Sequence, residues 1–203
     1  AMPVEKSGQK IFDFEYGEDF GKHIEDFDPT FSKVLVRFNP DDDPETKRIQ
    51  FERLKRLNDW LRERDRKFLL ELLVPATKAQ LESVGGDSDR YDREVRPGLT
   101  IQAVAEFYEA GVEPDVWKIE GLDRREDCER MAAQVRSGGR DRVGCVVLGR
   151  GADPERVDHW LRQAAGVPGY IGFAIGRTLW WEGVQGFLNG SLTREQAAEK
   201  IAA

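Results

Sequence analysis

The chain has 203 residues, of which 39% are hydrophobic and 34% are charged, a composition typical of a soluble globular protein. We expect a single domain over residues 1–203. Its formal net charge of −7 provides no basic footprint, which argues against nucleic acid as a partner. No apolar run reaches membrane-spanning length and no signal peptide precedes the first predicted strand, so we expect a cytoplasmic protein without membrane contact.

The cysteines and histidines form no recognisable metal or redox motif. Cys128 falls in a predicted helix and Cys145 in a predicted strand, so we expect packed thiols in a reducing compartment, with a redox role as the lesser alternative. His23 and His159 lie in charged helical stretches at no metal-binding spacing. We therefore expect neither a metal nor a cofactor.

Short apolar runs alternate with amphipathic helical patterns along the chain. Asp43 and Asp153 are each followed by proline, which is an N-cap with proline at the first helical position. In chain order, the sequence predicts strands at 2–6 and 33–38, a helix after Asp43, a strand at 67–73, a helix at 100–110, strands at 116–120 and 144–148, a helix after Asp153, a strand at 170–175 and a helix at 193–202.

This alternation predicts βα units and an α/β fold with a parallel sheet covered by helices. About six units are visible, whereas a TIM (β/α)8 barrel needs eight and about 250 residues. We expect a barrel of this type that lacks about two units at its amino end. The alternative is an open doubly wound sheet, but the sequence has no Gly-rich dinucleotide fingerprint.

A long, polar, turn-rich stretch at 84–98 follows the third predicted strand after a few intervening residues. In a barrel it would be a βα loop on the catalytic face. A solvated surface insertion is an equally weighted alternative.

Side-chain parity indicates which charged residues point into the barrel, because successive side chains of a strand face opposite sides. In the strand at 67–73, the fully apolar set should pack on helices, which turns Glu71 inward. The same argument turns Lys118 and Arg37 inward, and it places Lys6 on the opening strand less firmly. We expect Lys6, Arg37, Glu71 and Lys118 to converge on one mouth. A structural ion-pair network is the alternative.

Lys118 lies near the end of a buried strand that a proline precedes and a glycine follows. Burial disfavours a charged ammonium and favours the neutral amine, which attacks a carbonyl to form a Schiff base. A second cation at Lys6 would add to this effect by repulsion. The sequence therefore suggests amine nucleophilic catalysis.

Two glycine–arginine pairs end neighbouring strands and suggest an anion site. Gly149-Arg150 follows one strand, and Gly176-Arg177 follows the next and opens a helix. Glycines expose backbone N–H groups, and arginine adds bidentate donors for a phosphate. The loops after the last two strands are the usual phosphate site of this barrel. The alternative is turn glycines with surface arginines.

Several of these segments resemble a known set of enzymes. Residues 5–8 (EKSG), 70–72 (LEL), 116–120 (VWKIE) and 176–180 (GRTLW) resemble tagatose 1,6-bisphosphate aldolases. Nearly the whole chain, including 33–40, 148–160 and 169–181, resembles the DUF2090 domain, which is the 2-deoxy-5-keto-D-gluconate 6-phosphate aldolase domain of myo-inositol catabolism. That resemblance implies a class I aldolase on a TIM barrel.

The resemblance also implies roles and products. It makes Lys118 the Schiff-base lysine, Glu71 the acid/base carboxylate and Lys6 an active-site cation. It implies cleavage to dihydroxyacetone phosphate and malonate semialdehyde without a metal. The phosphate cup would comprise Gly149, Arg150, Gly176 and Arg177, with Arg37 as a further substrate-binding residue from the parity argument.

Two rivals stay open. One is a non-catalytic sugar-phosphate-binding or regulatory domain attached to a sugar kinase, since the DUF2090 domain often follows a ribokinase-like kinase. The other, weaker rival is a metal-dependent aldolase. The amino-terminal units that we expect to be missing would leave exposed sheet edges, through which copies could pair into a homo-oligomer, or would leave the chain inactive.

Overall fold

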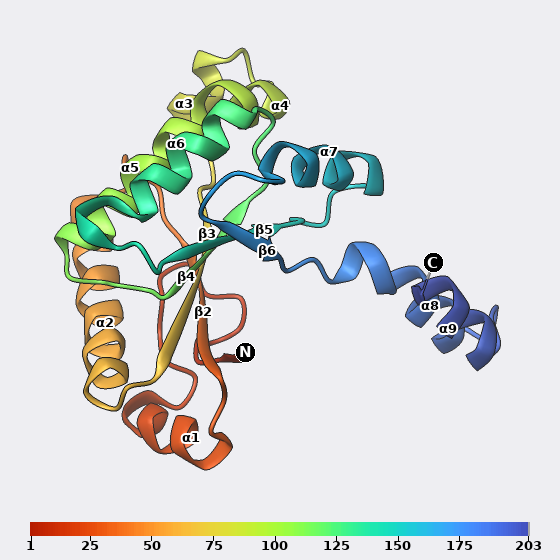
Figure 1. Cartoon of the computed structure of the whole chain (residues 1–203), viewed down its shortest axis with the longest axis horizontal. Helices are drawn as coiled ribbons and strands as arrows, with labels where there is room; N and C mark the ends of the chain where they lie inside the picture. The colour runs from red at the N-terminus through yellow and green to blue at the C-terminus, as the bar shows by residue number, and fades with distance from the viewer. Residues whose placement is uncertain (203) are drawn as a thin grey trace.

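A computed structural model describes residues 1–202, except for the side chains of residues 177–179. Within this range, the strands form a parallel sheet in the simple order β1-β2-β3-β4-β5-β6 (Figure 1). The α/β class is confirmed, and the sequential order distinguishes the sheet from a doubly wound one. The sheet is open. The strands are β1 Met2–Pro3, β2 Phe31–Arg37, β3 Lys67–Leu73, β4 Val116–Glu120, β5 Gly144–Leu148 and β6 Tyr170–Phe173.

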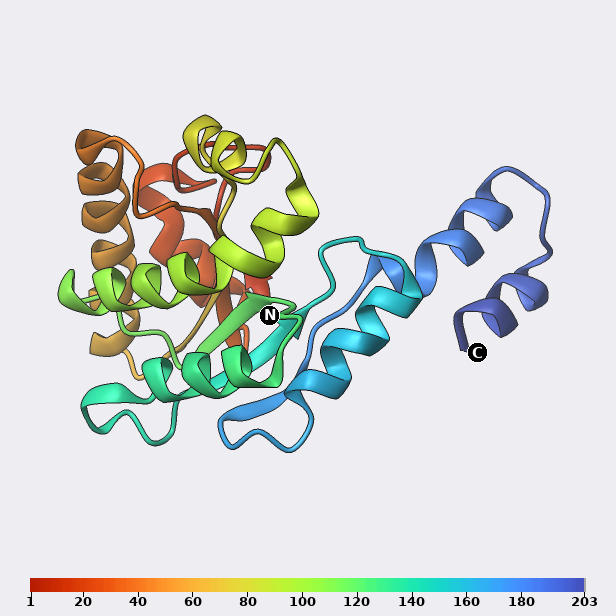
Figure 2. The same ribbon diagram turned by 90° about the horizontal axis from the view of Figure 1, so that it is seen from above.

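The long helices that follow β2 to β5 lie along one face of the sheet (Figures 1 and 2). These helices are α2 Pro44–Glu63, α5 Arg96–Glu109, α6 Arg125–Val135 and α7 Pro154–Ala164. The remaining helical segments are a 3-10 turn at Gly17–Asp19, α1 Phe20–Phe27, α3 Lys78–Ser83, α4 Ser88–Arg90, a π-helical turn at Tyr91–Val95, a 3-10 turn at Ser137–Gly139, α8 Arg177–Leu188 and α9 Arg194–Ala202. None of the described helices is long and apolar enough to cross a membrane.

Local capping explains where the main helices begin. The Asp43 side chain accepts a hydrogen bond from the backbone N–H of Thr46, and Asp153 accepts one from Arg156, as the Asp-Pro pairs predicted. Thr77 and Gln80 form a reciprocal capping box at the start of α3. These caps satisfy backbone donors that the first helical turn leaves without partners.

The two faces of the sheet differ as parity predicted. Side chains on the helix-covered face are almost fully buried, and Trp117 at its centre is 0% exposed with its indole N–H donating to Tyr108 Oη at 2.9 Å. Several side chains on the opposite face, among them Leu35, Leu69 and Val146, are only partly buried. The second face is therefore the one that can accept a ligand.

Among the differences from the prediction, three bear on the candidate site. The first strand ends at Pro3 rather than at residue 6, because the chain turns and Glu5 pairs antiparallel with Phe14. The polar stretch 84–98 is largely helical, because Asp87 caps α4 and Pro97 is accommodated in the first turn of α5. The strand at 170–175 ends at Phe173.

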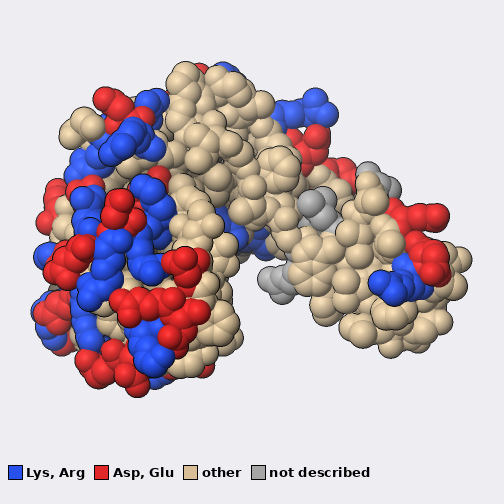
Figure 3. Space-filling view, turned by 60° about the horizontal axis from the view of Figure 1, so that its bottom comes forward, with Lys and Arg blue, Asp and Glu red and all other residues tan. Residues whose placement is uncertain are grey.

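The helices α8 and α9 pack on each other and project from the body of the molecule (Figure 2). They leave the last strand uncovered, with Ile171 and Phe173 exposed. Charged side chains crowd the flank of the molecule that carries α2, whereas few surround the hollow between the body and this projection (Figure 3). The hollow lies beside the uncovered face of the sheet.

Substituting Gly121 by alanine should destabilise the fold by about 1–3 kcal/mol, because the new methyl group overpacks the core. A Cβ at Gly121 would lie 2.0 Å from the Trp160 ring, which is buried and hydrogen-bonded to Asp123. As a control, Gly98→Ala on α5 meets nothing within 4 Å and should stabilise by about 0.5–1 kcal/mol. Urea denaturation measures both changes. An unchanged free energy of unfolding for Gly121→Ala would contradict this packing.

Candidate active site

Glu71 and Lys118 form the centre of a charged cluster on the uncovered face. They are directly paired residues of β3 and β4, and Lys118 Nζ lies 3.2 Å from Glu71 Oε1. The Lys118 side chain is 17% exposed and the Glu71 side chain is 8% exposed. Both residues therefore lie on the side that side-chain parity predicts, because parallel pairing brings equivalent positions of adjacent strands together.

Lys33 and Glu5 complete the cluster, although neither was predicted from the sequence as a site residue. Lys33 Nζ lies 3.2 Å from Glu71 Oε2 and 2.7 Å from Glu5 Oε1. Carboxylates and ammonium groups thus alternate in the order Glu5, Lys33, Glu71, Lys118. Lys33 could have been found, because it shares its side of β2 with Arg37.

Lys6 does not join this cluster. Its side chain is 50% exposed and its Nζ lies 3.1 Å from Asp13 Oδ2. The hydrogen bond from Lys6 holds the pKa of the Asp13 carboxyl below its ordinary value. The expected placement of Lys6 was wrong because Pro3 pairs with Lys33, so Pro3 and Glu5 lie on the side of Lys33. Val4 is buried on the other side, so parity does not bring Lys6 to the cluster.

A cavity of about 360 Å³ opens at the carboxyl ends of the strands, beside this cluster. It brings together most of the residues that the sequence suggested, from β2, β3, β4 and the loops after β5 and β6. The side chain of Arg177 lies outside the described residues, although its backbone begins α8. The cavity is lined by Leu35, Arg37, Glu71, Leu73, Lys118, Leu148, Gly149, Arg150, Gly151, Ala174, Ile175, Gly176 and Trp180.

The cationic groups of this cavity differ in their partners. Arg37 Nη1 donates to the backbone oxygen of Gln9 at 3.0 Å. Arg150 instead contacts two carboxylates: Nη1 lies 2.6 Å from Asp92 Oδ2 and Nε lies 3.0 Å from Glu120 Oε1. Arg37 on β2 and Arg150 in the loop after β5 thus reach the cavity from opposite sides of β4, which carries Lys118.

Behind Arg150 lies a buried network that sequence reasoning missed. Arg96 is 0% exposed, its Nε donates to Asp92 Oδ1 at 2.9 Å and its Nη2 donates to the backbone oxygen of Gly121 at 2.8 Å. Glu120 accepts a hydrogen bond from the backbone N–H of Val74 at 2.9 Å. The only signal in the sequence was the unusual length of the polar stretch after β3.

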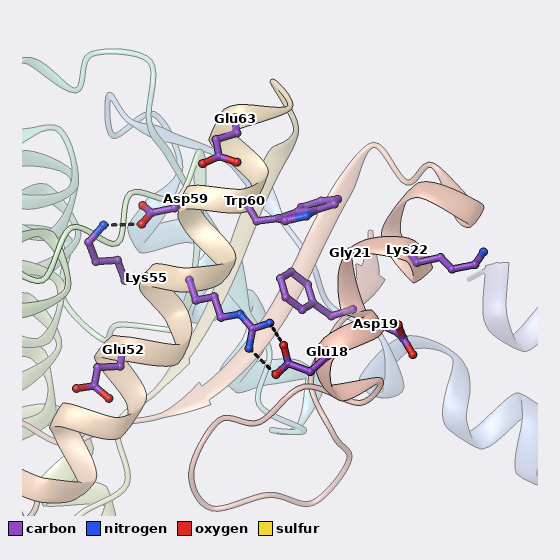
Figure 4. A pocket seen from close by; sticks show the side chains of 11 residues that line it. Glu18, Asp19, Gly21, Lys22, Glu52, Lys55, Asp59, Trp60 and Glu63 are labelled. Atoms are coloured by element: carbon purple, nitrogen blue, oxygen red, sulfur yellow. Dashed lines mark hydrogen bonds and ion pairs between the residues drawn. The ribbon is translucent and has the colours of Figure 1, made fainter.

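A larger cavity of about 650 Å³ lies between α1 and α2, far from this chemistry (Figure 4). Two pairs of its charged side chains contact each other: Arg56 donates two hydrogen bonds to Glu18, and Lys55 pairs with Asp59 at 2.6 Å. These contacts are exposed to solvent, where ion pairs contribute little. Its chemistry is that of a solvated helix surface, so size alone does not make it the site.

The cysteines and histidines lie away from the cavity. Both thiols are buried, and burial raises the pKa of Cys128 to about 11 and also raises that of Cys145, as packed thiols should show. His23 stacks on Tyr16, and His159 lies 3.0 Å from the backbone oxygen of Asp123. In the described part of the chain, no three His, Cys, Asp or Glu residues form a group that could hold a metal ion.

Solved aldolase structures share this fold. An archaeal fructose 1,6-bisphosphate aldolase aligns with 88% of this chain and 63% of its own, at a TM-score of 0.60 and 15% identity. The fructose-bisphosphate aldolase of Slackia heliotrinireducens aligns with 99% of this chain and 65% of its own, at 0.59 and 14% identity. A Corynebacterium glutamicum protein, Cgl0159, aligns with 89% of this chain and 54% of its own, at 0.54 and 18% identity.

The chain thus spans less than two thirds of each of these proteins, and at these identities the likeness shows the fold alone. No curated protein matches the sequence. One family profile, described as uncharacterized protein conserved in bacteria (DUF2090), matches residues 1–203. The chain therefore belongs to the DUF2090 family, as its resemblance suggested.

Proposed function

We propose that this protein is a class I aldolase in which Lys118 forms a Schiff base with a phosphorylated ketone. The observation that carries the proposal is the contact of 3.2 Å between Lys118 Nζ and Glu71 Oε1 on the wall of the cavity. An amine beside a carboxylate combines a nucleophile with a group that can give and take protons. The site also lies at the carboxyl ends of the strands, where enzymes with this barrel fold carry their catalytic groups.

The cavity distinguishes Lys118 from its neighbour Lys33. Lys118 lines the cavity, whereas Lys33 lies behind Glu71 and is held by Glu5. Lys33 is therefore suited to hold Glu71 in place and to balance its charge. We assign nucleophilic attack to Lys118 and electrostatic support to Lys33, a role that the sequence analysis had given to Lys6.

The proposed reaction conserves atoms and electrons at each step. Glu71 first takes a proton from the Lys118 ammonium, and the neutral amine attacks the ketone carbon. A proton passes from the nitrogen to the former carbonyl oxygen, and Glu71 returns its proton to that hydroxyl, which leaves as water to give an iminium. Glu71 then removes the proton of the hydroxyl on the far side of the scissile bond. The bond breaks, an aldehyde leaves, and the electron pair passes to the iminium to form an enamine. Protonation and hydrolysis release the ketone and regenerate the amine.

The cations around the cavity favour an anionic substrate. Arg37 and Arg150 line it, and Gly149 and Gly176 bring backbone groups to the same cavity. Arginine pairs well with phosphate or carboxylate oxygens. Together with the DUF2090 resemblance, this supports 2-deoxy-5-keto-D-gluconate 6-phosphate as the substrate in myo-inositol catabolism, cleaved to dihydroxyacetone phosphate and malonate semialdehyde.

Release of dihydroxyacetone phosphate from this substrate tests the reaction. A coupled assay with glycerol-3-phosphate dehydrogenase should record NADH oxidation that depends on the protein and persists in EDTA. Loss of the activity in EDTA would support a metal-dependent aldolase instead. Tight binding of the substrate without any turnover would support the non-catalytic sugar-phosphate-binding domain.

A further inference from the structure

The loop that carries Arg150 has an unusual backbone. Arg150 has a φ of 53° and therefore adopts the left-handed region, which side chains other than glycine rarely occupy. A glycine would adopt this φ without a steric cost, as the following Gly151 does at a φ of 73°. Such a conformation persists where surrounding contacts hold it, and it occurs often at ligand-binding sites.

Two carboxylates from different elements hold the Arg150 guanidinium. Glu120 ends β4 and contacts Nε at 3.0 Å. Asp92 contacts Nη1 at 2.6 Å and comes from the π-helical turn Tyr91–Val95. With Nε and Nη1 engaged, Nη2 is the nitrogen that remains for another acceptor. The orientation of the guanidinium is therefore determined by two fixed points rather than by one flexible ion pair.

Arg96 fixes Asp92 in turn. Its Nε donates to the second carboxylate oxygen of Asp92, so the two oxygens of Asp92 serve two different guanidinium groups. Tyr91 anchors the same turn by donating to the backbone oxygen of Val74 at the end of β3, at 3.0 Å. Tyr91 and Arg96, on either side of Asp92 in the chain, thus attach it to the backbone just after β3 and β4.

The network is neutral overall and faces the cavity through one member. It contains two carboxylates, Asp92 and Glu120, and two guanidinium groups, Arg96 and Arg150. The Arg150 side chain is 39% exposed, against 0% for Arg96, 12% for Asp92 and 4% for Glu120. Burial alone would raise the pKa of Asp92, but the hydrogen bond from Arg150 and the charge of Arg96 outweigh it and hold that pKa below its ordinary value.

We propose that Asp92 is a positioning residue for anion binding, which holds the Arg150 guanidinium at the wall of the cavity so that it can receive the phosphate of the substrate. The proposal rests on the aldolase function only in that it names the phosphate of that substrate as the ligand. It makes the π-helical turn after β3 part of the active site, and it explains why a non-glycine residue occupies the left-handed position.

Titration with inorganic phosphate tests this role without any turnover. Isothermal titration calorimetry should show that Arg150→Gln and Asp92→Asn each weaken phosphate binding by about tenfold, and the double variant should bind no more weakly than Arg150→Gln alone. Asp127→Asn is the matched control, since Asp127 is as buried as Asp92 and pairs with Arg130 away from the cavity. That variant should bind phosphate like the wild type.

Three results would overturn the proposal: no phosphate binding by the wild type, wild-type affinity in Asp92→Asn, or losses that add in the double variant. If Asp92→Asn does not fold, Arg150→Lys tests instead whether phosphate binding needs the orientation of the guanidinium that the two carboxylates fix. Lysine keeps the charge but cannot contact both carboxylates with a planar fork. It should bind phosphate as weakly as Arg150→Gln, and wild-type affinity would show that charge alone suffices.

A kinetic measurement separates positioning from a general structural defect. With the phosphorylated substrate, Asp92→Asn should raise KM by about tenfold and change kcat much less, whereas partial unfolding would lower kcat alone. Borohydride reduction of the wild type with dihydroxyacetone, which carries no phosphate, tests Schiff-base formation separately. An adduct with unaltered phosphate binding in Asp92→Asn would reject only the positioning role, and no adduct with weakened binding would reject only the aldolase.

Discussion

Replacing Lys118 by arginine is expected to abolish aldol cleavage, with a loss in kcat of about 10⁴-fold or more. Arginine keeps a positive charge beside Glu71, where Lys118 Nζ now lies 3.2 Å from Oε1, but its guanidinium cannot form a Schiff base. Substrate affinity should change far less, because the anion-binding groups stay in place. Cleavage assays and calorimetric titration of substrate would measure the two effects separately.

The matched control is Lys67→Arg on β3. Lys67 begins that strand at the opposite end of the sheet, is 53% exposed and pairs with Asp115. This substitution should leave kcat unchanged. If Lys118→Arg still turns over substrate, Lys118 is not the nucleophile.

Replacing Glu71 by glutamine should lower kcat by about 10²–10⁴-fold, the usual contribution of a general acid–base group. Glutamine has nearly the same shape, but it can neither protonate the departing hydroxyl of the carbinolamine nor remove the proton of the hydroxyl on the far side of the scissile bond. It also removes the negative charge between Lys33 and Lys118, whose Nζ atoms lie 3.2 Å from its two oxygens. Rapid-quench measurement of product formation would record the loss.

Glu106→Gln is the control for this variant. Glu106 lies on α5, is 19% exposed and pairs with Lys47 at 2.6 Å, away from the cavity. Its substitution removes a comparable ion pair and should leave the rate unchanged. A Glu71→Gln variant with full activity would require another acid–base group in the cavity.

Much of the fold could be predicted because the signals were local. Strands β3, β4 and β5 were predicted with their observed bounds from short apolar runs, and α2 and α7 from their Asp-Pro starts. The meeting of Glu71 with Lys118 followed from parity alone, since both belong to the same side of neighbouring parallel strands.

The rest of the site depends on contacts between distant segments. Glu5 takes the place expected for Lys6 because the pairing of Pro3 with Lys33 puts Glu5 on the side of Lys33 and buries Val4 on the other. No periodic pattern in so short a strand could show this register. Asp92 and Arg96 were hidden in a polar stretch whose Pro97 and Gly98 suggested a turn, although the first turn of a helix tolerates both. Their network with Glu120 and Arg150 could not be predicted, because these residues are far apart in the sequence and meet only in the folded chain.

The most direct test of a Schiff base at Lys118 is reductive trapping. The protein is incubated with dihydroxyacetone phosphate and sodium borohydride, its intact mass is measured, and the modified peptide is mapped. The account predicts one ligand-sized adduct, located on Lys118. An adduct located on Lys33 instead, or an unmodified protein at saturating ligand, would contradict it.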